Sequence, residues 1–173
     1  MSQIFIISVD GKDFKTWEKK HPNLPIDRLQ YTHKYNHGGV KYEIAIDVYQ
    51  SKVVWFSGPH RGGLHDRDIF VGYGLADKIP PGKKVICDRV YGNERDALYH
   101  SKLALPNMLD SQELAKFKAR ARCRHESLNG RLCYFKSMSE TYRHAHAKHK
   151  FVFQSVIVIV QYEMDLGAKL FDV

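Results

Sequence analysis

Residues 4–13 read Ile-Phe-Ile-Ile-Ser-Val-Asp-Gly-Lys-Asp, and this stretch decides how the rest of the chain is interpreted. Its aliphatic and β-branched residues predict a buried strand over residues 4–9 that ends at Asp10. A second apolar strand is predicted over residues 83–87 and is followed by Asp88. Ligand sites of α/β sheets cluster where strands end, which makes both aspartates candidates for a shared site. An aspartate after a strand is also a common turn residue, and that alternative stays open.

Two further strands are predicted between these aspartates, over residues 41–49 and 52–57. The first alternates apolar and polar residues with the period of two that a strand requires. The short link between them predicts a hairpin, and Gly58-Pro59 is expected to end its second strand. Residues 12–30 are polar and contain two prolines, so they are expected to form an excursion from the sheet.

Helices are predicted in three places. A short one follows the hairpin, with Asp66 as its N-cap; a place for His65 and Asp66 on the rim of an active site is the alternative. Ser111 is expected to cap a long helix. A last helix is predicted over residues 150–166, stopped by Gly167, although its β-branched residues leave a strand as the alternative. The long helix has apolar positions at helical spacing, namely Leu114, Phe117, Ala121, Leu128, Leu132 and Phe135.

The order strand, hairpin, helix, strand, long helix, helix predicts an α/β fold with a mixed sheet flanked by helices. Glu126 lies on the long helix, so it would approach the two aspartates from a third element. Three converging carboxylates could hold two divalent ions, and their hard oxygen ligands suit Mg²⁺ or Mn²⁺. Two such ions about 3.5–4 Å apart clamp the attacking and leaving oxygens of an in-line phosphoryl displacement. The alternative for Glu126 is a plain ion pair with Arg122, four residues earlier.

Charge and composition limit the class of protein. The chain has 173 residues, a net charge of +8 and a sequence pI of about 9.3, which favours an anionic partner such as DNA. Three cysteines without a CxxC pair argue against a disulfide framework and against zinc. The longest apolar run, residues 156–160, is far shorter than the roughly 20 residues of a membrane span, and residues 1–9 do not form a signal peptide. An intracellular protein with no membrane partner is therefore expected.

Basic residues follow one another along the long helix and are candidates for contact with DNA phosphates. A solvated helix face is the alternative. These candidates are Lys116, Lys118, Arg120, Arg122, Arg124 and Arg131.

Several short motifs occur in an order that resembles the DDE endonuclease domain of PIF/Harbinger-type transposases, and they cover nearly the whole chain. They are Ser8-Val9-Asp10-Gly11, Lys41-Tyr42-Glu43-Ile44, Val54-Trp55-Phe56-Ser57-Gly58-Pro59, His65-Asp66, Asp88-Arg89-Val90-Tyr91-Gly92 and Arg124-His125-Glu126-Ser127-Leu128-Asn129-Gly130-Arg131.

This resemblance implies a ribonuclease H-like fold and a metal-dependent enzyme that cuts and joins DNA. It assigns Asp10, Asp88 and Glu126 as the three family carboxylates, with two Mg²⁺ or Mn²⁺ ions as cofactors. It also implies a nuclear protein, because the group is mainly eukaryotic. The expectation is that the three carboxyl groups share one cluster and that Glu126 does not pair only with arginine.

The chain also departs from the family pattern. Lys12 stands where the family often has threonine, and Arg89-Val90 follow Asp88 in place of small residues. Such transposases usually carry a helical DNA-binding region before the first aspartate, whereas nine residues precede Asp10 here. Residues 1–173 are therefore expected to form the endonuclease domain alone. Recognition of a DNA site would then come from a separate DNA-binding protein, and a homo-oligomer stays open.

Two other classes of protein remain. The first is a domesticated or decayed, non-catalytic DNA-binding protein with the same fold. The second is a basic α/β protein with no nucleic-acid role, which the ordered set of motifs disfavours.

Overall fold

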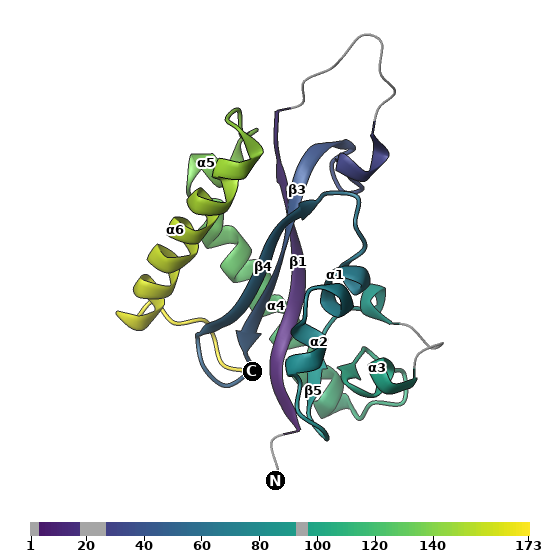
Figure 1. Ribbon diagram of the computed structural model, residues 1–173. Coiled ribbons are helices and arrows are strands. Elements are labelled where there is room, and N and C mark those ends of the chain that lie inside the picture. Colours follow the sequence, from purple (N-terminus) through teal and green to yellow (C-terminus); the bar gives the residue numbers. More distant parts are fainter. Residues whose placement is uncertain (1–3, 18–26, 93–96) are drawn as a thin grey trace.

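The computed structural model describes residues 4–17, 27–92 and 97–173. A twisted sheet runs through the middle of the molecule and carries helices on both faces (Figure 1). Within the described ranges its strands are β1 (Phe5–Lys15), β2 (Tyr31–Thr32), β3 (His37–Asp47), β4 (Val53–Arg61), β5 (Lys84–Ile86) and β6 (Leu103–Ala104).

The sheet is mixed, as the sequence predicts. β3 pairs antiparallel with β1 and with β4, while β5 pairs parallel with β1 and with β6. The main strand order is therefore β4-β3-β1-β5-β6, and β2 adds to the end of β3 where Gly38 and His37 lie. This α/β arrangement is consistent with a ribonuclease H-like fold.

Helices cover the two faces of the sheet unequally (Figure 1). The three C-terminal helices lie on one face: α4 (Gln112–Leu132), α5 (Lys136–Ser139) and α6 (His146–Asp165). Three short helices lie on the other: α1 (Asp66–Gly72), α2 (Leu75–Lys78) and α3 (Ala97–Ser101). Single 3₁₀ turns, η1 (Arg28–Gln30) and η2 (Arg89–Tyr91), complete the described elements. No helix in these ranges combines the length and apolar character that a membrane span requires.

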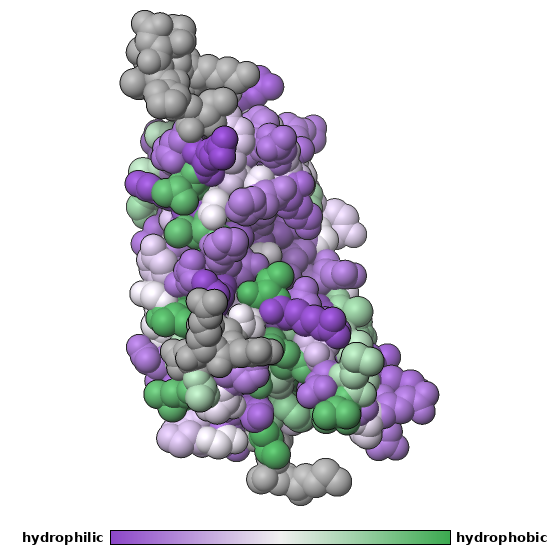
Figure 2. Space-filling model, turned by 90° about the vertical axis from the view of Figure 1, so that its right-hand side faces the viewer, coloured by the Kyte–Doolittle hydropathy of each residue, from purple (hydrophilic) through white to green (hydrophobic). Residues whose placement is uncertain are grey.

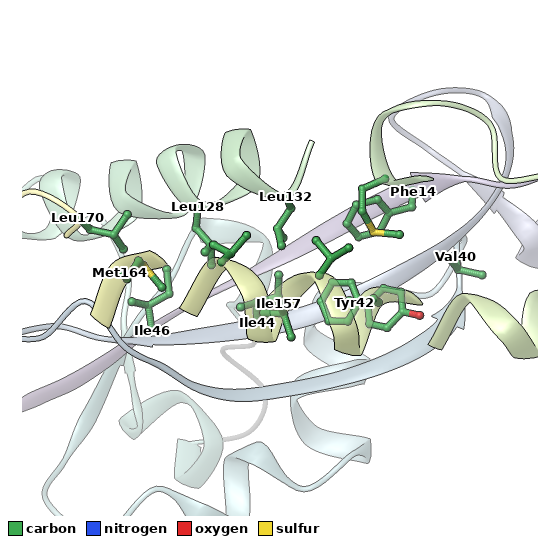
Figure 3. Close-up of a cluster of buried hydrophobic side chains, with 14 residues drawn as sticks. Phe14, Val40, Tyr42, Ile44, Ile46, Leu128, Leu132, Ile157, Met164 and Leu170 are labelled. Carbon is green, nitrogen blue, oxygen red and sulfur yellow. The ribbon is translucent and has the colours of Figure 1, made fainter. Parts of the chain in front are cut away.

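The alternation of β3 divides its side chains between two cores. Tyr42, Ile44 and Ile46 point toward α4 and α6, where they pack against Leu128 and Leu132 (Figure 3). All five are at most 1% exposed. Burying one such side chain stabilises a fold by about 1.5–3 kcal/mol, so this face supplies much of the driving force for folding.

The second core lies under the short helices. Ala45 of β3 contributes to it from the opposite face of the sheet, with Val9 of β1. Phe70, Tyr91 and Tyr99 close it from α1, η2 and α3. The outer surface on this side carries hydrophilic residues over its upper part and clusters of hydrophobic residues lower down (Figure 2).

β1 is longer than predicted. The strand does not end at Asp10 but continues to Lys15, because the antiparallel ladder with β3 supplies partners for this whole stretch. The predicted excursion is therefore strand over residues 12–15, and its residues 18–26 lie outside the described ranges. The parallel ladder with β5 does stop early, since its last pair joins Ser8 to Ile86. Asp10 thus lies in mid-strand, two residues beyond the point where β5 ends.

β4 also passes its predicted end. The strand continues through Gly58 and Pro59 to Arg61, with a shift of register against β3. Gly58 has a φ of +138° and lies close to the ring of Tyr42, which is 2.5 Å from where a Cβ would stand. Only glycine fits this combination of backbone angle and close approach, so Gly58 allows the strand to continue rather than ending it.

The helix boundaries confirm some predictions and correct others. Ser111 caps α4, since its hydroxyl accepts a hydrogen bond of 3.2 Å from the backbone N–H of Leu114. Residues 150–166 are helical, and the helix starts earlier than expected, at His146. The N-cap of α1 is His65, so the prediction that Asp66 caps it is wrong. The carboxylate of Asp66 instead accepts a hydrogen bond from a lysine on β3.

Candidate active site

A pocket of about 310 Å³ opens between β1, the end of β5 and α4. Asp10, Asp88 and Glu126 all line it, each from a different one of these elements. The three carboxylates that the sequence singles out therefore face one cavity. The other lining residues are Val9, Ala119, Arg122, Cys123 and His125.

Asp10 is the most buried of the three carboxylates. Burial raises the pKa of its carboxyl group to about 6, and the negative charges of Asp66 and Asp88 add to the rise. A hydrogen bond from the backbone of Gly11 and the charge of Lys34 oppose it without cancelling it. The carboxylate form of Asp10 is thus short of compensating positive charge, as expected of a group that receives a cation.

Asp88 occupies the turn that follows β5. Its carboxylate accepts a hydrogen bond of 2.7 Å from the backbone N–H of Arg89 and so caps η2. The guanidinium of Arg122 also contacts it, at 3.4 Å. Asp88 is therefore a turn residue and also lines the pocket. The two roles are compatible, because a carboxylate that caps a turn still has oxygen lone pairs that can bind a cation.

Glu126 lies on the exposed side of α4 and does not form the predicted alternative pair with Arg122, which contacts Asp88 instead. A buried contact close by fixes this part of the helix against β1. The hydroxyl of Ser8 and Nε2 of His125 are 2.9 Å apart, and both residues are at most 2% exposed. Ser8 is two residues from Asp10 and His125 is next to Glu126, so this contact holds β1 and α4 together beside the two carboxylates.

The three carboxylates line one pocket but do not form the close cluster that the sequence predicts. Among the described residues, no group of three or more His, Cys, Asp or Glu side chains is close enough to hold one ion. The set nevertheless fits hard divalent cations, because it consists of oxygen ligands around a pocket in which Asp10 lacks positive charge.

A second group of charged residues lies behind Asp10. It includes Asp66, for which the sequence left a place on the rim of the active site as the alternative to a helix cap; Lys41 was not predicted as part of the site. The ammonium of Lys41 bonds to the Asp66 carboxylate at 2.7 Å and to the carbonyl oxygen of Leu64 at 3.0 Å. The Asp66 carboxylate lies against Gly11, with Oδ1 2.5 Å from where a Cβ would stand. Gly11 therefore lets the start of α1 approach β1 directly beside Asp10. The motif His65-Asp66 was the sequence signal for this contact.

Glu43 belongs to the same region and is buried without a partner. It is 1% exposed, and neither carboxyl oxygen has a hydrogen-bond partner among the described residues. Burial, reinforced by the charge of Asp66, raises its pKa to about 8, while the nearby indole of Trp55 acts weakly in the opposite direction. At neutral pH this glutamate is mostly protonated. The alternating pattern of β3 does not reveal it, because Glu43 occupies a polar position of that pattern. It lies on the same side of the strand as Ala45, and the structure buries that side as well.

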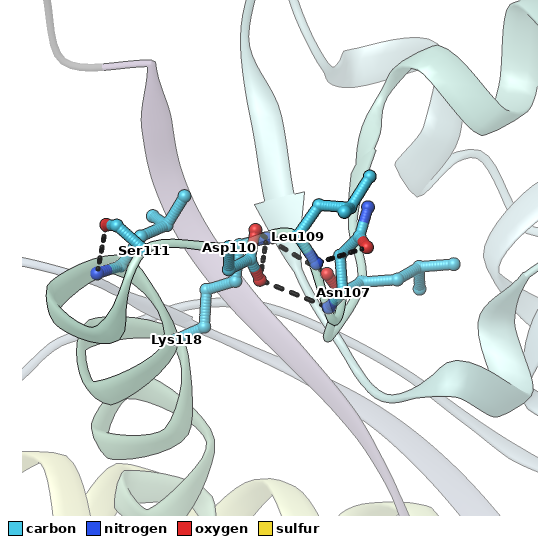
Figure 4. Close-up of polar contacts among 7 residues, drawn as sticks. Asn107, Leu109, Asp110, Ser111 and Lys118 are labelled. Atoms are coloured by element: carbon cyan, nitrogen blue, oxygen red, sulfur yellow. Dashed lines mark hydrogen bonds and ion pairs between the residues drawn. The ribbon is translucent and has the colours of Figure 1, made fainter.

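The basic residues of α4 are mostly bound within the fold, which corrects part of the predicted DNA-binding set. Lys118 is 6% exposed, and its ammonium donates to both carboxylate oxygens of Asp110, each at 2.9 Å, and to the carbonyl oxygen of Leu105 (Figure 4). Arg124 is 2% exposed. Neither side chain has a free cationic head for a phosphate, so the prediction is wrong for these two residues.

Two other members of that set fasten the C-terminal segment to α4. The guanidinium of Arg120 donates to the carbonyl oxygen of Asp172, at 2.5 and 3.1 Å. Arg131 donates to the carbonyl oxygens of Ala168 and Lys169. Both arginines keep exposed surface, but their hydrogen-bonding groups are partly used. This leaves Lys116 and Arg122 as the members of the predicted set least occupied by contacts within the fold.

Arg124 instead holds the β3–β4 hairpin. Its guanidinium donates to the carbonyl oxygens of Asp47, Val48 and Gln50, which form the turn. We expect Arg124→Ala to lower the free energy of unfolding by about 2–4 kcal/mol, because three carbonyls of the turn, that of Val48 buried, would lose a charged donor. Urea denaturation would measure this, with the exposed Lys116→Ala as control. Equal stability of the two variants would refute this role for Arg124.

A larger hollow of about 630 Å³ lies at the outer edge of β6. Its lining is mainly apolar, and its one carboxylate, Asp110, is bound to Lys118. This larger hollow lacks convergent groups for catalysis. The acidic pocket is therefore the better candidate for the active site, although it is smaller.

The fold and this pocket define a class: α/β proteins with a mixed sheet, consistent with a ribonuclease H-like fold, and acidic residues around one pocket between the sheet and a long helix. A family model described as DDE superfamily endonuclease matches residues 9–161 of this chain. The chain therefore belongs to the DDE superfamily endonuclease family. No curated protein and no solved structure matched it significantly.

Proposed function

We propose that this chain is a metal-dependent DNA endonuclease domain of the transposase type, in which Asp10, Asp88 and Glu126 hold two Mg²⁺ or Mn²⁺ ions. One observation carries the proposal: the three carboxylates line a single pocket although they come from β1, the end of β5 and α4. Membership of the DDE superfamily endonuclease family supports the same chemistry.

The bound cations would activate the attacking oxygen and stabilise the leaving oxygen of a phosphodiester. The protein's own residues hold and orient them. Asp10 is fixed by the β1–β3 ladder, and the Ser8–His125 contact keeps α4 at a set distance from it. Glu126 and Asp88 are exposed enough to turn toward an arriving ion. The carboxylates need not act as acids or bases.

DNA would reach the pocket along its basic rim. Arg122 lines the pocket, and Lys34 lies near enough to lower the pKa of Asp10. With Lys116, these side chains are the proposed phosphate contacts, and binding should weaken as salt rises. The assignment to the PIF/Harbinger group, a single domain over residues 1–173, a nuclear location and a separate DNA-binding partner are further parts of the proposal.

A non-catalytic DNA-binding protein of the same fold is the second candidate. The contact between Arg122 and Asp88 favours it, because the guanidinium takes up charge that a metal would otherwise use.

The purified chain, supercoiled plasmid and either Mg²⁺ or Mn²⁺ at low salt provide the test. Nicked or linear plasmid that disappears with a chelator would support the endonuclease. Salt-sensitive plasmid binding without nicking would support the second candidate. Absence of both nicking and binding would refute the two together.

Arg122 provides a separate prediction on metal binding. We expect Arg122→Gln to raise the affinity for Mn²⁺ by roughly 3- to 10-fold, because a positive charge near the pocket is removed and Asp88 is released. Isothermal titration calorimetry in the absence of DNA would measure the change. Arg67→Gln is the control, since Arg67 pairs with Asp68 on α1 outside the pocket lining. Unchanged affinity in Arg122→Gln would show that this arginine does not compete with the ion.

A further inference from the structure

Helix α6 is apolar on two opposite sides, although only one of them faces the sheet. The inner side is fully buried against β3, β4 and α4. The outer side carries large apolar residues that no described element covers: Phe151 (67% exposed), Val158 (65%), Ile159 (44%), Tyr162 (63%) and Leu166 (70%). A helix that is hydrophobic all round is normally covered all round, so this outer side calls for an occupant.

The exposed residues form one continuous stripe. With 3.6 residues per turn, positions 151, 155, 158, 159, 162 and 166 lie on the same side of the helix. Ser155 is the small residue in its middle, and its hydroxyl already donates to the carbonyl oxygen of Phe151 at 3.0 Å. The Ser155 hydroxyl would therefore keep its hydrogen bond when the stripe is covered. Because serine is small, a neighbouring helix could approach closely at this point.

The charges of α6 are arranged against its own dipole. The first turn contains no acid and the last turn no base. Lys148 lies exposed near the N-terminal end of the stripe and Asp165 near the C-terminal end. Such an arrangement is unfavourable for an isolated helix, whose N-terminus prefers negative charge and whose C-terminus prefers positive charge. An antiparallel helix alongside it would turn the same charges into attractive pairs.

We propose that the outer stripe of α6 is the interface with a second copy of this chain, the two α6 helices packing antiparallel about a two-fold axis. One register pairs the centre of the stripe and the charges at its ends: Lys148 faces Asp165 of the second copy, Phe151 faces its Tyr162, and Ser155 faces its Val158. Each residue number and that of its counterpart add to the same value, as an antiparallel pair requires. A two-fold axis repeats every contact, so the interface holds two copies of each pair.

The chemistry of these pairs suits an interface. Phe and Tyr provide an aromatic contact, and the tyrosine hydroxyl can remain at the wet edge. The Asp165 Oδ1 accepts a hydrogen bond of 2.8 Å from Gln161, which holds the carboxylate in place and leaves its second oxygen for lysine. The acidic pocket is lined from β1, the β5 end and α4, and no residue of the stripe lines it. The inference is therefore independent of the proposed endonuclease activity.

Sedimentation velocity and light scattering over a range of protein concentrations test the interface. The chain should show a concentration-dependent shift from the mass of one copy to that of two. Val158→Asp should remain a monomer, with unchanged circular dichroism, since the side chain is exposed. Leu98→Asp is the matched control, because Leu98 is 75% exposed on α3, across the sheet. A wild-type chain that stays monomeric at all concentrations would overturn the proposal and leave the stripe to another occupant.

Charge reversal tests the register. Lys148→Glu and Asp165→Lys should each weaken dimerisation, because each creates a like-charged pair twice per dimer. The double variant Lys148→Glu/Asp165→Lys should regain most of the lost affinity, since every pair is again of opposite sign. A dimer that survives Val158→Asp, or a double variant weaker than both single ones, would rule out this interface or this register.

Discussion

Asp10→Asn is expected to reduce metal-dependent plasmid nicking by about 10³-fold. A metal site contributes several kcal/mol of charge stabilisation to such a reaction, and each 1.36 kcal/mol is tenfold in rate. Asparagine retains the shape of Asp10 but lacks the negative charge that attracts the cation. Plasmid binding, measured in parallel, should change little, because the proposed phosphate contacts are other residues.

Loss of activity in this variant would not arise from unfolding. The pKa of Asp10 is raised to about 6 in the fold, so the stability it provides when protonated is lost as pH rises from about 4 to 6. A neutral asparagine avoids that loss. The metal-free variant should therefore be at least as stable as the wild type above pH 6, as thermal denaturation would show.

Glu126→Gln should reproduce the loss of nicking, and Asp68→Asn should not. Asp68 is an exposed acid of α1 that pairs with Arg67 and does not line the pocket. Nicking that persists in both Asp10→Asn and Glu126→Gln would assign the activity to another site or to a contaminant.

Glu43→Gln is expected to stabilise the protein at alkaline pH, by on the order of 4 kcal/mol at pH 8 relative to the difference at pH 4. In the fold the pKa of Glu43 is about 8, against 4.5 in an unfolded chain. The unfolded chain thus releases its proton first as pH rises. Each unit of that difference corresponds to 1.36 kcal/mol, and the stability falls between about pH 4.5 and 8. Glutamine has no proton to lose and removes this slope.

Urea denaturation of both proteins across this pH range measures the effect. The quantity to compare is the difference in unfolding free energy between wild type and Glu43→Gln at each pH. Asp10 also makes stability fall with rising pH, at lower pH, and His125, with a pKa lowered to about 4, makes it rise. Both proteins contain Asp10 and His125, so these two contributions cancel in the difference. Glu163→Gln, an exposed acid on α6, should show no such trend. Parallel curves for wild type and Glu43→Gln would mean that Glu43 is ionised at neutral pH.

Local sequence was sufficient for the regular elements whose causes are local. The apolar runs before Asp10 and Asp88, the serine cap of α4 and the glycine after α6 each act over a few residues, and each was identified correctly in kind. The boundaries failed where a partner strand decided them. β1 continues past Asp10 because β3 lies beside it, and β4 continues past Pro59 because Gly58 adopts an angle that fits the Tyr42 ring.

The candidate carboxylates were found from the sequence because apolar runs precede Asp10 and Asp88 and short motifs surround all three acids. Their environment was not. Lys41, Glu43 and Asp66 are far apart along the chain from Asp10 and approach it only when β3 and α1 pack onto β1. In the same way, a run of basic residues in the sequence does not show which of their charged groups are already bound within the fold. Lys118 and Arg124 are bound to loop groups that the tertiary fold brings to α4.

The sequence by itself thus determined the class of fold, the order of its elements and the three acids that could bind metal, since these follow from periodicity and from residues adjacent in the chain. Only the tertiary structure decided that the acids share one pocket, that a protonated glutamate lies behind it, and that α6 presents an uncovered apolar side. These properties depend on burial and on distances between segments remote in sequence, and burial is what changes a pKa or leaves a surface without a partner.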